Sequence, residues 1–274
     1  NRVIYEYKFA PDSTKTDSLK TEWMYLDISK KGSKFYSKST FESDSTVQES
    51  IKKQLSSGMR NVSISRQRQG GEINYEVEKT YPEYKTYLIA NIGNDAYTVL
   101  EDRKMNWNIA PEKKQIGEFK VQKATTDFAG RNWTAWFTAD VPIQDGPYKF
   151  HGLPGLIVKV EDEGKNYSWE LKGNKKVENF NEITYLESIS PGGSGGKVQE
   201  VSREKFEKTF NDYKKDPFAS ARPMLRPEMM SQKMPGSDTT IGDMVKQQEK
   251  MLKDFYGANN NPIEIAVPAA KGKK

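Results

Sequence analysis

The chain has 274 residues, with 43 lysines and arginines, 38 aspartates and glutamates, and a net charge of +5. Its 14 tyrosines, 12 phenylalanines and 5 tryptophans, together with this low net charge, exclude an intrinsically disordered protein. The absence of cysteine excludes disulfides, thiolate zinc sites and a cysteine nucleophile, and the single histidine, His151, excludes a multi-histidine metal site. Acidic and basic residues are interleaved, so we expect no nucleic-acid partner. Without cysteine or a second histidine, we also expect no metal and no other cofactor. No apolar run approaches the roughly 20 residues of a membrane-spanning helix, so we expect a chain that does not span a membrane.

The N-terminal part predicts strands with one helix after them. Apolar residues alternate over 3–9 and 23–29, which indicates two strands, and a turn at 31–32 leads into a third strand over 34–38. Val47, Ile51 and Leu55 then recur at helical spacing, with Ser45 as the expected N-cap and Gly58 as the end.

The middle of the chain is almost wholly β in character. Short β-rich runs are separated by turn residues at 69–71, 93–94 and 111–112, and Gly130 supplies a positive φ for a turn between two strands. This pattern predicts an antiparallel meander with strands over 62–64, 73–77, 87–92, 97–100, 105–109, 119–126, 132–138, 156–160, 167–171 and 183–186.

The C-terminal part predicts helices. A helix should follow Ser202 and stop at Asp216 and Pro217, and a second should run over 241–256, with an irregular Pro- and Met-rich stretch between them over 217–236. We therefore predict a β-rich domain over 1–189, a Gly/Ser linker over 190–197, a helical extension packed on the sheet over 198–257, and a tail over 258–274 that is disordered from Asn259. The expected fold class is α+β, mainly antiparallel, with one large curved sheet or half-barrel, one inserted helix and two C-terminal helices.

The most specific motif in the sequence is the hexapeptide Gly152-Leu153-Pro154-Gly155-Leu156-Ile157, which we call the signature. An aromatic strand ending in Asp-Val-Pro and a Gly-Pro pair precede it, and the sequence Asn-Asn-Pro-Ile-Glu follows at 260–264. These features resemble the GLPGLI family of Bacteroidota over essentially the whole chain. The resemblance implies cell-envelope proteins made with a signal peptide, of unassigned function and without established catalytic residues. Because no signal-like segment is present, we expect a processed, exported chain.

Pro154 and Gly155 occupy the second and third positions of a predicted type II turn, which needs a positive φ at Gly155. The turn either has a purely structural role or allows a ligand to come close to the backbone. The aromatic residues nearby either line an apolar cleft for a small molecule or peptide, or form a plain aromatic core. Trp133 falls on one face of its strand and Trp136 on the other. The candidate ligand- or partner-binding residues are Trp133, Trp136, Asp140, Tyr148, Phe150, His151, Leu153 and Pro154.

Two functions are compatible with these residues. The first is a non-enzymatic exported protein of the periplasm or outer membrane, acting as a binding or accessory protein for an outer-membrane β-barrel or TonB-dependent receptor system, or as a carrier of an apolar or peptide ligand. The alternative is a hydrolase in which His151, a weak catalytic candidate, works with Asp140 or Asp145. No nucleophile-elbow motif accompanies this histidine, which favours the first function.

Overall fold

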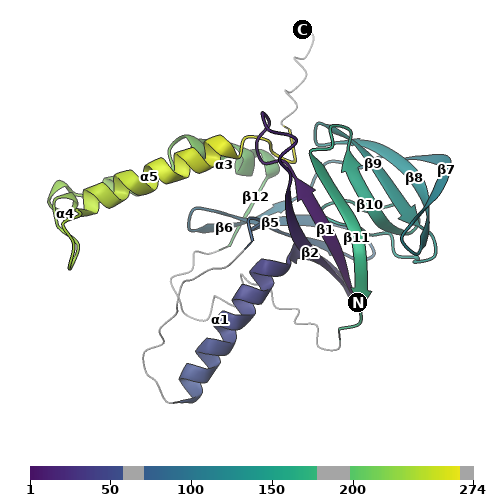
Figure 1. Cartoon of the computed structure of the whole chain (residues 1–274), viewed down its shortest axis with the longest axis horizontal. Helices are drawn as coiled ribbons and strands as arrows, with labels where there is room; N and C mark the ends of the chain where they lie inside the picture. Colours follow the sequence, from purple (N-terminus) through teal and green to yellow (C-terminus); the bar gives the residue numbers. More distant parts are fainter. Residues whose placement is uncertain (58–70, 178–197, 266–274) are drawn as a thin grey trace, which may run out of the picture.

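A computed structural model describes residues 1–57, 71–177 and 198–265. Within them, twelve strands form one sheet in the order β12-β6-β5-β4-β3-β2-β1-β11-β10-β9-β8-β7 (Figure 1). The strands are β1 (Arg2–Phe9), β2 (Lys20–Ile28), β3 (Gly32–Ser37), β4 (Glu76–Thr80), β5 (Thr86–Ile92), β6 (Asp95–Leu100), β7 (Asn108–Ile116), β8 (Phe119–Phe128), β9 (Arg131–Thr138), β10 (Leu156–Asp162), β11 (Tyr167–Lys175) and β12 (Gln199–Val201). The β12–β6 pair is parallel and the other pairs are antiparallel, which confirms the predicted fold class.

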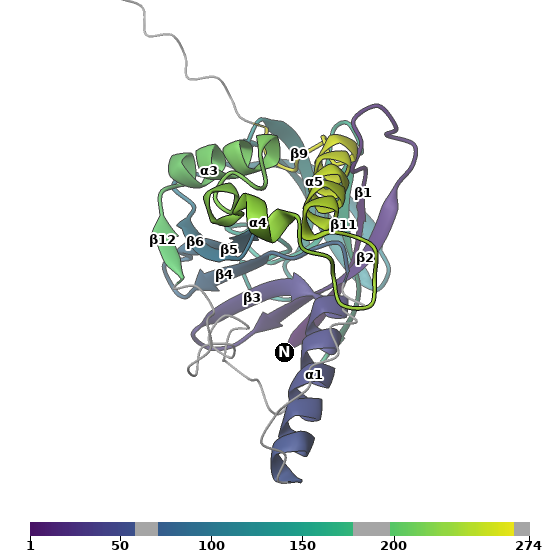
Figure 2. The same ribbon diagram turned by 90° about the vertical axis from the view of Figure 1, so that its left-hand side faces the viewer.

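The sheet curls strongly, and the main core lies on its inner face (Figures 1 and 2). Alternation explains why: Tyr5 and Tyr7 of β1 point inward and pair with Leu171 and Trp169 of β11. The Trp169 ring stacks on the Tyr7 ring with 4.6 Å between centroids. Large aromatic rings from adjacent strands thus fill the hollow that the curvature creates.

The 139–155 loop between β9 and β10 fills the rest of this hollow. Its Tyr148 and Phe150 belong to the main core and contact Trp169, and Leu153 is fully buried. Although β9 and β10 are neighbours, the loop reaches across the inner face to β3 and β4, four and five places from β10 in the strand order. The signature at 152–157 therefore lies where this core-filling loop leads into β10.

The helix α1 (Lys38–Ser56) begins earlier than the sequence pattern indicates. Its N-cap is Ser37, whose hydroxyl accepts a hydrogen bond from the Thr40 amide, so the prediction of Ser45 as N-cap is wrong. Residues 38–46 lack apolar periodicity, so the sequence pattern does not predict the first two turns of this helix. Phe41 in these turns packs against Tyr25 and Tyr36 on the outer face of the sheet.

The strand β7 runs through Pro111 and Glu112, where a turn was expected. It is an edge strand paired only with β8, and its register shifts between Ile109 and Lys113. Proline is tolerated there because an edge strand does not need every amide as a donor.

The C-terminal helices are α3 (Arg203–Lys215), the 3₁₀ turn η1 (Arg222–Met224), the short α4 (Pro227–Met230) and α5 (Ile241–Ala258). Ser202 caps α3 as predicted, and α3 covers β5 and β6 through Phe206 and Phe210. Residues 259–265 are ordered, in contrast to the disorder expected from Asn259, because Asn260 binds Ser13 and Asn261 binds the Ala10 carbonyl. Within the described part of the chain, no helix is long and apolar enough to cross a membrane.

Several predicted features lie outside the described residues. They are the strands over 62–64 and 183–186, the linker over 190–197 and the tail beyond residue 265. The division of the chain into these four segments stays a prediction.

Candidate functional site

The signature forms a tight three-residue turn. The Gly155 amide donates to the Leu153 carbonyl at 2.7 Å, so the hydrogen bond closes around Pro154 rather than across the four residues of a type II turn. Gly155 has a φ of 151°, and a Cβ built there would lie 2.0 Å from the Thr138 carbonyl oxygen. A glycine is thus required at position 155 for two reasons: the end of β9 leaves no room for a Cβ, and the residue has a positive φ.

A buried carboxylate pins the loop to the opposite strands. Asp145 is fully buried, and its Oδ1 accepts from the Lys79 ammonium at 2.6 Å and from the Gly146 amide at 2.6 Å. Its Oδ2 accepts from the Ser33 hydroxyl at 2.5 Å and from the Tyr81 hydroxyl. Lys79 also donates to the Gly146 carbonyl at 2.7 Å. All of these hydrogen bonds are made inside the core, where an unpaired charge is costly.

The strand register explains how these groups meet. Ser33 of β3 lies opposite Lys79 of β4, and both point into the hollow of the sheet. Burial favours the neutral form of the Asp145 carboxyl, but the Lys79 ammonium and the hydroxyls of Ser33 and Tyr81 outweigh this and lower its pKa. The Asp145 carboxylate is therefore ionised and saturated with hydrogen bonds, which suits an anchor rather than a proton-transfer group.

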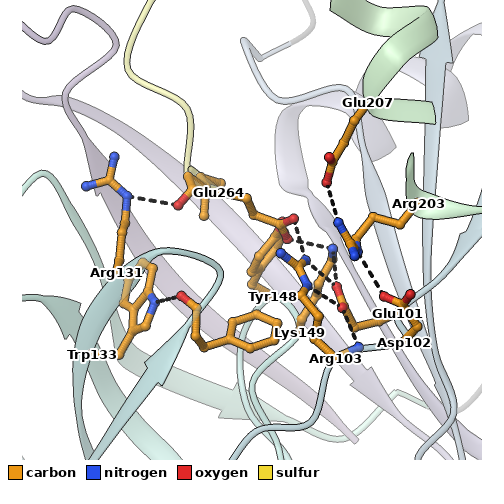
Figure 3. A network of polar contacts seen from close by, with 12 residues as sticks. Glu101, Asp102, Arg103, Arg131, Trp133, Tyr148, Lys149, Arg203, Glu207 and Glu264 are labelled. Atoms are coloured by element: carbon orange, nitrogen blue, oxygen red, sulfur yellow. Dashed lines mark hydrogen bonds and ion pairs between the residues drawn. The ribbon is translucent and has the colours of Figure 1, made fainter. Parts of the chain in front are cut away.

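A second polar cluster anchors the same loop. Lys149 is buried between Glu101, at 2.7 Å, and Glu264, at 2.6 Å. Arg103 also contacts both carboxylates, and the Tyr148 hydroxyl donates to Glu264 at 2.5 Å (Figure 3). Burial opposes ionisation of Glu101, but Arg103 and Lys149 lower its pKa to about 2. This network links the loop to the segment after α5.

His151 is half-buried at the edge of the loop. Its ring stacks on Tyr84 with 5.4 Å between centroids, and its carbonyl accepts from the Trp107 indole. Within the described residues its imidazole has no hydrogen-bond partner, so no serine or threonine is held beside it. Burial and repulsion by Lys79 lower its pKa to about 4, against the opposing effect of Asp145, and the ring is neutral at pH 7.

This lowered pKa predicts an acid-sensitive stability. The unfolded chain binds a proton at His151 below about pH 6.5 and the folded chain only below about pH 4, so stability falls as the pH drops through this window. The full shift corresponds to about 3 kcal/mol, which partial solvent contact reduces to about 1–2 kcal/mol. We expect His151→Phe, which keeps a ring against Tyr84, to remove this part of the dependence in urea unfolding measured from pH 7 to pH 4.5. An unchanged pH dependence in the variant contradicts the assignment. The contribution of Glu101 to stability is lost at lower pH, because its pKa in the folded chain is about 2.

An open cleft lies beside the loop, with a volume of about 440 Å³. Its apolar wall comes from Ile28, Pro142 and Ile143, and its aromatic wall from Tyr81 and Tyr84, whose ring centroids are 4.7 Å apart. Asn1, Ser29 and Lys30 complete the lining. Tyr84 has a φ of 53°, a strained conformation for a bulky residue, and it places this ring between the cleft and His151.

The structure separates the residues that the sequence grouped. Trp133, Tyr148, Phe150 and Leu153 are buried in the aromatic core, and Trp136 is buried on the other face beneath the Lys114 ammonium. Asp140 and Pro154 are exposed. Of the candidate set, His151 reaches the cleft, through the stacking of its ring on Tyr84.

Sequence reasoning missed the cleft tyrosines and the anchor pair. Lys79 carried a weak signal, because it continues the inward alternation of Tyr75 and Val77 on one strand. Tyr81 and Tyr84 carried no signal, since nothing local shows that residues 81–84 face the 139–155 loop.

Comparisons with known proteins place the loop at the centre of a family match. Residues 128–159, which include the signature, match the family model described as "Protein of unknown function (Porph_ging)". This match covers a small part of the chain and does not by itself establish the GLPGLI resemblance.

Curated relatives share only part of the sequence. Phospholipase B-like 1 from Homo sapiens is 26% identical over 136 residues, which cover 47% of this chain and 21% of that protein. The Bos taurus protein of the same name is 24% identical, with coverages of 47% and 22%. The chain thus spans about a fifth of the length of these relatives.

A solved structure of PNGF-II in space group C2 resembles this chain with a TM-score of 0.50 and 12% sequence identity. The likeness covers 78% of this chain and 33% of that one, and it concerns the fold alone.

Proposed function

We propose that the chain is a non-enzymatic binding protein that takes an apolar or peptide ligand in the cleft lined by Tyr81, Tyr84 and Ile143. The observation that carries this proposal is the pairing of an aromatic, apolar cleft with a rigid wall. Tyr81 is fixed through its hydroxyl to Asp145, so the wall is preorganised by the same anchor that holds the loop.

The exported location belongs to the same proposal. We infer that the protein works in the periplasm or at the outer membrane, as an accessory or binding subunit of a β-barrel or TonB-dependent receptor system. Localisation is tested by fractionating the native host, and the partner by purification from cross-linked envelopes. Recovery in the cytoplasmic fraction overturns the proposed location but leaves the proposed ligand site unaffected.

The hydrolase alternative has less support. His151 is neutral and available as a base, but no nucleophile contacts it among the described residues, and Asp145 is occupied by four donors. General-base catalysis needs the base within hydrogen-bond reach of the proton it removes.

The ligand site is tested with the apolar dye Nile red and a competing leucine- and phenylalanine-rich peptide. We expect the dye fluorescence to saturate as the protein binds the dye. Tyr84→Ala should weaken the affinity for the dye at least about tenfold, because one aromatic wall of the cleft is lost. Tyr87→Ala, a half-buried tyrosine outside the cleft, is the matched control. Equal dye binding by the two variants contradicts the proposed site, and dye binding without peptide competition assigns it to small apolar ligands.

A further inference from the structure

The helix α5 exposes an apolar stripe that the described part of the chain leaves uncovered. Met244, Met251 and Phe255 are 43%, 61% and 50% exposed. With the exposed Gln248 and Ala258 between and after them, they recur at spacings of four, three, four and three residues. This spacing is typical of the seam between two packed helices. We call these five residues the α5 seam.

The side of α5 next to the seam already has its partner. Tyr256 contacts Phe210 and Tyr213 of α3, and Val245 and Leu252 on this side are half-buried. Among all its residues, only Gly242 is fully buried. Since helices in proteins gain most of their stability from packing, an 18-residue helix held so lightly favours a further contact.

The charge of α5 indicates what kind of surface covers the seam. Its three acidic residues, Asp243, Glu249 and Asp254, balance its three lysines, Lys246, Lys250 and Lys253. The three lysines share the polar side of the helix with all three acidic residues, so this side carries no net charge, unlike the strongly basic face that draws amphipathic helices to anionic lipid or nucleic acid. A heptad seam on a neutral helix fits another helix of the same kind.

We propose that the α5 seam pairs with the α5 seam of a second copy of this chain in antiparallel orientation. In this register Met244 lies opposite Phe255 of the second copy, and Gln248 lies opposite Met251. The larger ring thus meets a flexible side chain at each end. The half-buried Ile241, which precedes the seam by three residues, lies opposite the small Ala258. Each layer is repeated by the two-fold axis, as an isologous interface requires.

The position of α5 favours the antiparallel pairing over the parallel one. Its C-terminal end is tied to the sheet through Asn260 and Asn261, whereas its N-terminal end extends away from the sheet with α4 (Figure 1). Antiparallel pairing therefore puts the two sheets at opposite ends of the helix pair, where they do not collide. It also aligns the helix dipoles favourably.

The size of the seam predicts a weak dimer. A helix of 18 residues is about 27 Å long, so this contact lies below the standard size of stable interfaces. We expect sedimentation equilibrium to show a concentration-dependent monomer–dimer exchange in the micromolar range or weaker. Met251→Lys should raise the dissociation constant at least about tenfold, because it places a charge in the seam. Lys246→Glu, an exposed change away from the seam, is the control, and circular dichroism checks that both variants keep their helices. A purely monomeric wild type at millimolar concentration, or equal dissociation constants for the two variants, overturns the proposal.

The absence of cysteine makes the orientation directly testable. Under mild oxidation, a mixture of Gln248→Cys and Met251→Cys chains should form mixed disulfide dimers faster than either chain alone. Rapid self-cross-linking of Met251→Cys alone indicates a parallel pair and contradicts the antiparallel register.

Discussion

Asp145→Ala should lower the free energy of unfolding by about 3–5 kcal/mol, because it leaves the buried Lys79 ammonium without its counter-ion. The variant also removes the acceptor for two hydroxyls and the Gly146 amide. Such a loss is a large share of the roughly 5–15 kcal/mol that stabilises a typical domain. Urea unfolding followed by tryptophan fluorescence measures it.

Asp140→Ala is the matched control, since Asp140 lies in the same loop but is exposed. It should change stability by no more than about 0.5 kcal/mol. The double variant Lys79→Met, Asp145→Ala should be less destabilised than the two single changes together, because neither charge is then left alone. Additive effects of the two changes contradict a direct pairing of Lys79 with Asp145.

Gly155→Ala should cost about 2–6 kcal/mol, from about 1–3 kcal/mol of backbone strain and about 1–3 kcal/mol of overpacking. The new Cβ would meet the Thr138 carbonyl oxygen at 2.0 Å and its carbon at 2.7 Å. Both are backbone atoms of the β9 end, so relief requires moving β9 away from β10.

The first glycine of the signature supplies the comparison. Gly152 also has a positive φ, of 90°, but a Cβ there meets nothing within 4 Å. Gly152→Ala should therefore cost only the strain, about 1–2 kcal/mol. Equal costs for the two substitutions in thermal unfolding would falsify the view that close packing fixes the second glycine.

Local patterns predicted most of the fold because the strands that form the core alternate cleanly. Tyr5 and Tyr7 face inward as their period of two requires, and Ser202 caps α3. Errors arose where a local pattern was silent or overridden. The first turns of α1 are polar, and Pro111 continues a strand because β7 lies at the sheet edge.

The candidate site was less predictable, since it depends on contacts between distant residues. The sequence left the aromatic residues around the signature as either core or cleft, and Trp133 and Phe150 lie in the core. The cleft itself needs Tyr81 and Tyr84 to meet a loop about 60 residues later in the chain. Only the curvature of the sheet brings these segments together, and no local spacing encodes it.

The central claim is that the loop carrying the signature is a fixed part of the core that builds one wall of the cleft. Hydrogen–deuterium exchange tests it most directly. The Leu156 amide donates to Val141 and the Ile157 amide to Asp145, so we expect peptides over 145–157 to exchange as slowly as those of β1 and β11. Peptides of α5 should exchange much faster. Rapid exchange across 145–157, as in an exposed loop, contradicts the account.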